Sequence, residues 1–230
     1  MDTKFLKEKF YLGGYYIVEP LKRTKDLSKS IFPETILSAS DCVCEFFPRL
    51  IDSKEENEKY RKELMLDEKT YSEMLCWMKE RMGKDFGYPN VFNSYESACE
   101  FCKKFLYNKT NLTILGFAIP KGEWKDTFLE EDNEICYGIC GNVNKEIYID
   151  ERGKVLGYEI LGYDFQSFHS YICNSLENDY DEKFGFKLNE NGFISTFEEA
   201  EKLADYTNVE LDGAEPVFWC PWLILQYPIE

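Results

Sequence analysis

Histidine occurs only once in the 230 residues, so a zinc site with two histidine ligands is excluded, and any catalytic triad would depend on His169. The sequence contains no Gly-x-Gly-x-x-Gly or Gly-Lys-Ser/Thr phosphate loop and no Gly-x-Ser-x-Gly elbow, which removes the signatures of nucleotide binding and serine hydrolysis. No stretch approaches the roughly 20 apolar residues of a membrane helix. The N-terminal stretch also lacks the apolar segment of a signal peptide. We therefore expect a cytoplasmic protein with no membrane partner and no cofactor.

The sequence does contain enough apolar residues for a sizeable core. Hydrophobic residues make up 44% and aromatic residues 17% of the chain, a composition far from that of disordered proteins. The length suits one large domain or two small ones. Cysteine occurs nine times, an odd number in a chain without an export signal. We therefore expect reduced thiols in a reducing compartment.

Positive charge is scarce in the C-terminal half. The net charge of the chain is −16. Residues 1–30 contribute +3, residues 31–122 contribute −2, and residues 123–230 contribute −17, from 7 lysines and arginines against 24 aspartates and glutamates. A field of this sign repels nucleic acid and anionic membranes, and it attracts a basic partner.

Two segments in different halves of the chain resemble each other. "KDFGYPNVFNSYESACEFCKKFLY" occurs in the first half and "EKFGFKLNENGFISTFEEAEKLADY" in the second. In each, a cap residue is followed three positions later by a glutamate: Asn93 by Glu96, and Ser195 by Glu198. That is the spacing of a capping box at the start of a helix. An internal duplication explains the similarity, and the alternative is chance, because capped amphipathic helices are common.

Each half is predicted to share one order of elements: strand, helix, turn, capped helix, strand. Strands are predicted at Gly13–Val18 and Leu156–Leu161, and a helix at 167–185. The sequence thus predicts an α+β protein of two related lobes, each with a small antiparallel sheet and two helices, packed together. The N-terminal lobe would be residues 1–122, with a helical insertion, and the acidic C-terminal lobe would be residues 123–230.

His169 and Cys173 lie four residues apart in the predicted helix, so they would share one of its faces. A catalytic nucleophile pair is one interpretation. The favoured interpretation is a structural histidine beside a core cysteine, because catalytic pairs normally come from separate elements. Cys99 and Cys102 are likewise interpreted as small core residues of a helix, since a zinc site would need further ligands. We predict no metal site and no catalytic residues.

Three acidic clusters in the second half are the strongest indication of function. They fall in predicted turns and helix ends, where side chains are exposed, and aromatic residues lie near them in the sequence. An acidic rim with aromatic anchors is typical of a protein interface, although acidity also serves solubility alone in many proteins. The predicted partner-binding residues are Glu130, Glu131, Asp132, Glu134, Glu177, Asp179, Asp181, Glu182, Glu210, Asp212, Glu215, Trp124 and Tyr180.

The segment from Val155 to Tyr206 resembles the immunity proteins that bacteria make against polymorphic and contact-dependent toxins. The resemblance rests on the Gly-Tyr-Glu strand, the "SFHSY" helix start and the "NENGF" turn before a capped helix. It implies an acidic, cytoplasmic α+β protein that binds and blocks a toxin and has no chemistry of its own.

We therefore expect a non-catalytic protein that neutralises a basic protein partner, most simply a nuclease-type bacterial toxin, by covering its active site with carboxylates. Two alternatives stay open. One is a phage-type inhibitor of a nucleic-acid-guided defence system, which would act by the same mimicry of phosphates. The other is an enzyme that uses His169 with Cys173. The sequence does not indicate the oligomeric state.

Overall fold

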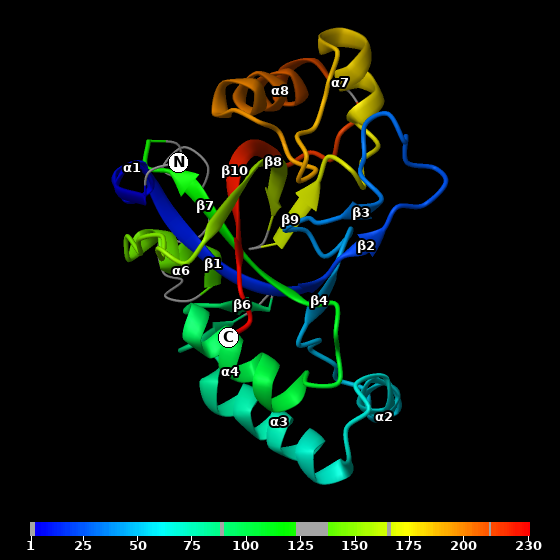
Figure 1. Cartoon of the computed structure of the whole chain (residues 1–230), viewed down its shortest axis with the longest axis vertical. Coiled ribbons are helices and arrows are strands. Elements are labelled where there is room, and N and C mark those ends of the chain that lie inside the picture. Colours follow the sequence, from blue (N-terminus) through cyan, green and yellow to red (C-terminus); the bar gives the residue numbers. More distant parts are fainter. Residues whose placement is uncertain (1–2, 88–89, 123–137, 165–166, 212) are drawn as a thin grey trace.

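The computed structural model describes residues 3–87, 90–122, 138–164, 167–211 and 213–230. Within these ranges an eight-stranded antiparallel sheet runs through the molecule, with helices packed against it (Figure 1). The helices are α1 (Thr3–Lys9), α2 (Lys54–Glu63), α3 (Glu68–Arg81), α4 (Tyr95–Phe105), α6 (Gly138–Asn144), α7 (Glu177–Phe184) and α8 (Phe197–Glu210). The strands are β1 (Phe10–Glu19), β2 (Leu21–Lys22), β3 (Thr35–Ile36), β4 (Glu45–Phe47), β5 (Phe86–Gly87), β6 (Val91–Phe92), β7 (Thr113–Pro120), β8 (Lys154–Asp164), β9 (Ser167–Ser170) and β10 (Phe218–Tyr227).

The large sheet is covered on both faces. Its strand order is β5-β6-β1-β7-β10-β8-β9, with β4 paired to β1 beside this path, and β2 and β3 form a separate pair. Along β1, Tyr15 and Ile17 belong to the core that also contains side chains of α3, α4, α7 and α8. Tyr16 and Val18 point to the other face and belong to a second core with Ile139 of α6. Because successive side chains alternate between faces, this burial explains why the central strands are apolar throughout.

The α+β class is confirmed, but the prediction of two lobes with small sheets is wrong. Strand β7 of the first half pairs directly with β10 of the second half, with Phe117 opposite Ile224. Both strands are buried along almost their whole length. At the edge of two separate sheets, such apolar strands would expose unpaired backbone groups to water and to other chains. The two halves therefore complete one sheet between them.

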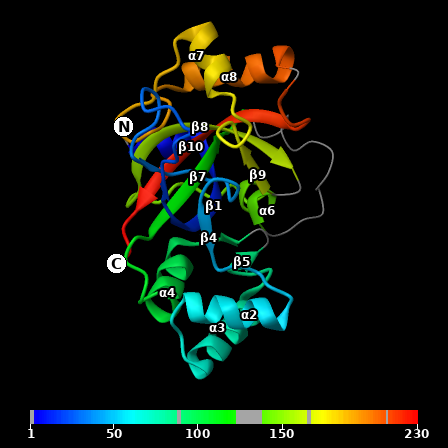
Figure 2. The same ribbon diagram turned by 90° about the vertical axis from the view of Figure 1, so that its right-hand side faces the viewer.

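The two similar sequence segments occupy matching places in this sheet. Strand β1 pairs with β7 as β8 pairs with β10, all antiparallel. Tyr15 of β1 pairs with Phe92, two residues before the cap of α4, and Tyr158 of β8 bridges to Ile194, two residues before the cap of α8. As a result, α3 and α4 lie at one end of the sheet, and α7 and α8 lie at the opposite end (Figures 1 and 2).

A glycine permits the close crossing at each of these places. Gly14 and Gly157 have φ angles of 143° and 141°, which side chains with a Cβ rarely adopt. A Cβ on Gly14 would lie 2.4 Å from a methyl carbon of Val91, and one on Gly157 would lie 2.6 Å from the carbonyl oxygen of Ile194. Glycine is therefore required where β1 and β8 cross the chain that leads into the capped helices.

The predicted caps are displaced by one residue. Helix α4 is capped by Ser94, whose side chain accepts a hydrogen bond from the backbone of Ser97. Helix α8 is capped by Thr196, which forms a complete capping box with Glu199. The neighbouring polar residues, Asn93 and Ser195, offered an equally good cap in sequence, and only the backbone path selects between them.

The helix predicted over 167–185 is wrong in its first half. Ser167–Ser170 form β9, which pairs with β8 so that Phe168 and Ser170 are buried. Turns follow, and α7 begins only at Glu177. The helical spacing of the apolar residues was produced by a strand followed by a turn, which periodicity alone does not distinguish. None of the helices in the described ranges is long and apolar enough to cross a membrane.

Candidate partner-binding surface on α7 and α8

Helices α7 and α8 are joined by a buried polar contact. The hydroxyl of Tyr180 lies 2.6 Å from Oγ1 of Thr207, and Thr207 in turn donates to the carbonyl oxygen of Leu203 at 2.9 Å. The tyrosine hydroxyl is therefore the donor in the contact between the helices. Tyr180 is fully buried and Thr207 nearly so. This contact fixes the position of α7 relative to α8.

The two sides of α8 differ sharply in composition. Ala200, Leu203, Ala204 and Thr207 are buried against the sheet. Residues at the intervening helical positions are exposed and mostly acidic. We call the exposed carboxylates of the two helices the acidic helix face; they are Asp179, Asp181, Glu182, Glu198, Glu199, Glu201, Asp205 and Glu210.

The matching helices of the first half show that the fold does not require this charge. Helices α7 and α8 together carry nine acidic residues and two lysines, a net charge of −7. Helices α3 and α4 carry five acidic and five basic residues, a net charge of zero. Helix α4 contacts β1, and α8 contacts β8 and β10. Apart from the buried Glu177, the charged residues of both helix pairs lie at exposed or half-buried positions, where packing does not dictate the residue.

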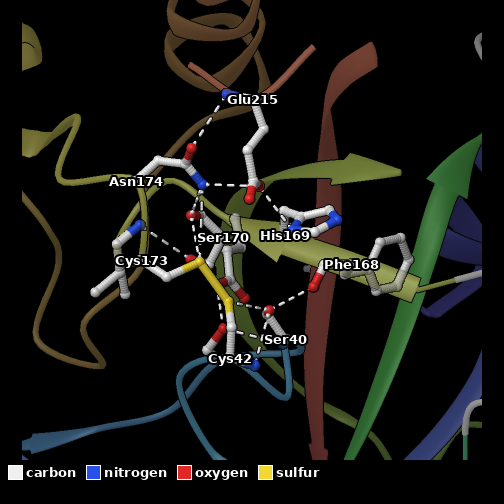
Figure 3. Close-up of a disulfide and its surroundings, with 11 residues drawn as sticks. Ser40, Cys42, Phe168, His169, Ser170, Cys173, Asn174 and Glu215 are labelled. Atoms are coloured by element: carbon white, nitrogen blue, oxygen red, sulfur yellow. Dashed lines mark hydrogen bonds and ion pairs between the residues drawn. A yellow bond between two sulfur atoms is a disulfide. The ribbon is translucent and has the colours of Figure 1, made fainter. Parts of the chain in front are cut away.

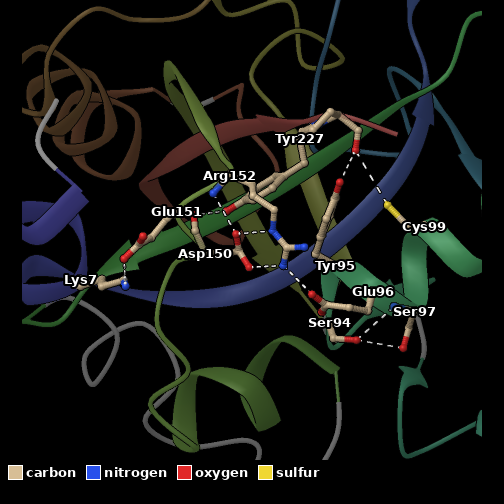
Figure 4. A network of polar contacts seen from close by, with 11 residues as sticks. Lys7, Ser94, Tyr95, Glu96, Ser97, Cys99, Asp150, Glu151, Arg152 and Tyr227 are labelled. Atoms are coloured by element: carbon tan, nitrogen blue, oxygen red, sulfur yellow. Dashed lines mark hydrogen bonds and ion pairs between the residues drawn. The ribbon is translucent and has the colours of Figure 1, made fainter. Parts of the chain in front are cut away.

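The two carboxylates of α4 are paired with cations. Arg152 donates to Asp150 and to Glu96, with 2.5 Å between Arg152 Nη2 and Glu96 Oε1 (Figure 4). Glu100 accepts from Lys104 at 2.6 Å. These cations lower the pKa values of Glu96, Glu100 and Asp150, each mainly through a hydrogen bond. The α4 end of the molecule is thus electrostatically balanced.

The acidic helix face lacks such pairing. Among the described residues, the one ion pair of this surface joins Lys183 to Glu210. The side chain of Glu199 is used in the cap of α8. The other six carboxylates of the surface have no cation within ion-pair distance in the described part of the chain. Their charge is therefore directed to solvent and is available to a positively charged molecule.

Two half-buried rings lie between the helices, and sequence reasoning missed both. Phe184 and Tyr206 form an edge-to-face pair with 5.3 Å between ring centroids. Lys183 lies 3.9 Å from the centre of the Tyr206 ring, and Lys202 lies 4.2 Å from that of Phe184. The signal was present in the sequence, since both rings stand at the edge of an apolar helical stripe. They give the acidic helix face an aromatic centre.

The predicted partner-binding residues fall into three groups. Asp179, Asp181, Glu182 and Glu210 belong to the acidic helix face, and Glu215 is exposed next to it. Glu177 and Tyr180 are buried, and burial raises the pKa of the Glu177 carboxyl. The remaining six predicted residues lie outside the described residues; they are Trp124, Glu130, Glu131, Asp132, Glu134 and Asp212.

The proposed pairing of His169 with Cys173 does not occur in this form of the protein. His169 lies in β9, and its Nδ1 is 2.7 Å from Oε2 of Glu215. Cys173 lies in the following turn and forms a disulfide with Cys42. The expectation of reduced thiols is therefore wrong for these two cysteines. Cys99 and Cys102 are buried in the core, as the core interpretation predicted.

Comparison of the chain with protein-family models, with curated proteins and with solved structures finds no match.

Proposed function

We propose that this protein binds a basic protein partner through the acidic helix face and blocks it. The observation that carries the proposal is the uncompensated charge of α7 and α8, set against the neutral, ion-paired helices at the matching positions. Following the resemblance to immunity proteins, we propose a nuclease-type bacterial toxin as the partner. The carboxylates would occupy the site where such an enzyme holds nucleic-acid phosphates.

Glu198 and Glu199 in the first turn of α8 favour helix stability, but the charges further along the helix do not, and this supports a role in binding. Glu201 and Asp205 are one turn apart, and like charges at this spacing destabilise a helix by about 0.2–0.5 kcal/mol. The last turn of α8 contains no basic residue and ends at Glu210, although a helix C-terminus favours cations. Selection for stability alone would disfavour both arrangements.

The proposed mechanism has two steps. Long-range attraction first guides the basic partner to the acidic helix face, which raises the association rate and makes it sensitive to salt. The exposed parts of Phe184 and Tyr206 then become buried in the contact, where aromatic side chains contribute most to affinity. The protein itself performs no chemistry in this scheme. We place it in the cytoplasm, where a toxin that attacks nucleic acid would act.

The test compares two variants that each lose four negative charges. The first carries Asp181→Asn, Glu182→Gln, Glu201→Gln and Asp205→Asn on the acidic helix face. The control carries substitutions of exposed glutamates on α2 and α3, namely Glu55→Gln, Glu56→Gln, Glu73→Gln and Glu80→Gln. Wild type, the face variant and the control are each immobilised on a column. A low-salt extract of the source cells is passed over each column, and mass spectrometry identifies the proteins that each one retains.

We expect wild type and control to retain a basic protein that the face variant loses. With that protein purified, the face variant should associate about tenfold more slowly or worse, and wild type should block its nuclease activity. Equal retention by all three columns, or an association rate that does not change with salt, would refute the proposal.

A further inference from the structure

The Cys42–Cys173 disulfide joins two surface segments that are far apart in the sequence. The two cysteines are separated by 131 residues, and their Cα atoms are 6.3 Å apart. Cys42 lies in the loop between β3 and β4, and Cys173 lies in the turn between β9 and α7 (Figure 3). Both residues are exposed. A dithiol in solution therefore has access to this bond without unfolding of the protein.

Beneath the disulfide, the same two regions are held together by hydrogen bonds that do not involve sulfur. Glu159 of β8 accepts from Ser38 at 2.5 Å and from Ser170 at 3.0 Å. Ser40 donates to the carbonyl oxygen of Phe168 at 2.5 Å. All three serines and Glu159 are buried. The loop around Cys42 therefore stays attached to β8 and β9 when the disulfide is open.

Polar groups are also in place for the reduced sulfurs. Oγ of Ser40 is 2.8 Å from Sγ of Cys42, and the carbonyl oxygen of Ser170 is 3.1 Å from Sγ of Cys173. Each can accept a hydrogen bond from a thiol. The side-chain nitrogen Nδ2 of Asn174 lies 3.8 Å from Sγ of Cys173, where it can donate a hydrogen bond to a thiolate. Cys173 is therefore better placed than Cys42 to be the sulfur that leaves.

We propose that Cys42 and Cys173 form a thiol–disulfide exchange site whose oxidation state controls the turn before α7. A thiolate of an incoming dithiol attacks Sγ of Cys42, the Cys42–Cys173 bond breaks, and Cys173 leaves as a thiolate that then takes up a proton. The second thiol of the reagent displaces Cys42 from the mixed disulfide. In sum, the dithiol gives two electrons and two protons, is itself oxidised to a disulfide, and leaves two protein thiols.

The expected consequence follows from the position of the turn. Residues 171–176 lead directly into α7, which supplies three carboxylates of the acidic helix face. With the covalent link open, the turn keeps its buried side chains Tyr171, Ile172 and Leu176 and the contacts of Asn174 with Glu215. It loses its only covalent attachment to the β3–β4 loop within the described residues. Oxidation thus orders the start of α7, and reduction loosens it.

The experiment uses full-length protein purified without reductant and titrated with mixtures of reduced and oxidised dithiothreitol. Thiols are labelled with a maleimide and located by peptide mass spectrometry. Exposed Cys76 on α3 serves as a positive control for labelling, and buried Cys99 and Cys102 report any unfolding. Cys42 and Cys173 should become labelled together on reduction, while Cys99 and Cys102 stay protected. Labelling of Cys42 and Cys173 before reduction, or only together with the buried pair, would overturn the proposal.

Hydrogen exchange then tests the structural consequence. On reduction, amides of residues 171–184 should exchange about tenfold faster or more, and those of α3 and α4 should not change. A Cys42→Ser/Cys173→Ser variant should show the fast exchange of residues 171–184 without reductant. A Cys76→Ser variant should keep the slow exchange of the oxidised wild type. If amide hydrogens exchange at the same rates in the oxidised and reduced proteins, the proposal that the disulfide controls the turn is refuted. None of these readouts involves a partner, so they stand or fall independently of the proposed binding function.

Discussion

The hydroxyl of Tyr180 donates a hydrogen bond to Oγ1 of Thr207 across the contact between α7 and α8, with 2.6 Å between the two oxygens. A Tyr180→Phe variant keeps the ring and removes this donor. We expect the free energy of unfolding, measured by urea denaturation, to fall by about 1 kcal/mol. Tyr206→Phe is the control, because the structure shows no hydrogen bond of that hydroxyl to the described residues. It should change stability by less than about 0.5 kcal/mol. Equal losses would contradict this account of the helix contact.

Replacing Glu201 by Lys should stabilise the protein while weakening partner binding. The change turns the like-charge pairs with Glu198 and Asp205 into favourable ones, with a gain of about 0.5 kcal/mol at low salt. Glu201 is exposed on α8, so a lysine side chain has room there. Thermal denaturation at low and high salt measures the gain, which should shrink as salt rises. A destabilised variant at low salt would show that the carboxylate has an unrecognised structural partner.

The stability of the protein should fall as pH rises through the range set by Glu159. Burial raises the pKa of its carboxyl from 4.5 to about 7, although Ser38, Ala39 and Ser170 donate hydrogen bonds that lower it. The folded state therefore retains a proton that the unfolded state loses. This stabilisation is complete below about pH 4.5 and is lost on passing pH 7, a change of about 3 kcal/mol.

Glu159→Gln provides the control for that pH dependence, since it removes the titrating group and nearly keeps the volume. Urea unfolding of both proteins between pH 5 and pH 8 is compared, so that other titrating groups cancel. The stability of the variant should decline less than that of wild type across this range. Parallel profiles would show that Glu159 titrates normally.

Gly14→Ala and Gly157→Ala should each destabilise the protein by about 2 kcal/mol or more, from backbone strain and from the clash of the new Cβ. The nearest atoms are a methyl carbon of Val91 and the carbonyl oxygen of Ile194, respectively. Gly122 is the control, because no heavy atom lies within 4 Å of a Cβ at that position. Thermal denaturation measures the stability of the Gly14, Gly157 and Gly122 alanine variants. Equal losses of stability in all three would disprove the requirement for glycine at positions 14 and 157.

Several parts of the fold could be predicted from local sequence. The strand Leu156–Leu161 and the capped helices that became α4 and α8 were predicted correctly, because short-range patterns of apolar residues and caps determine them. Glu159 was not recognised as buried, because a carboxylate in a strand is normally expected to face solvent. The serines that donate hydrogen bonds to it, Ser38 and Ser170, come from other segments, and the sequence does not show that they lie beside it. The ring pair of Phe184 and Tyr206 was missed because the two rings come from different helices, although each stands at the edge of an apolar helical stripe.

The sequence by itself determined the α+β class, the excess of negative charge in the second half and the matching order of elements in the two halves, because each depends on composition or on residues close together in the chain. Only the tertiary structure decided that the halves share one sheet, that Cys42 pairs with Cys173 and that most carboxylates of the acidic helix face have no ion-pair partner among the described residues. Those features depend on residues brought together from distant segments. The energy that selects the shared sheet is the burial of β7 against β10, which neither half can achieve alone.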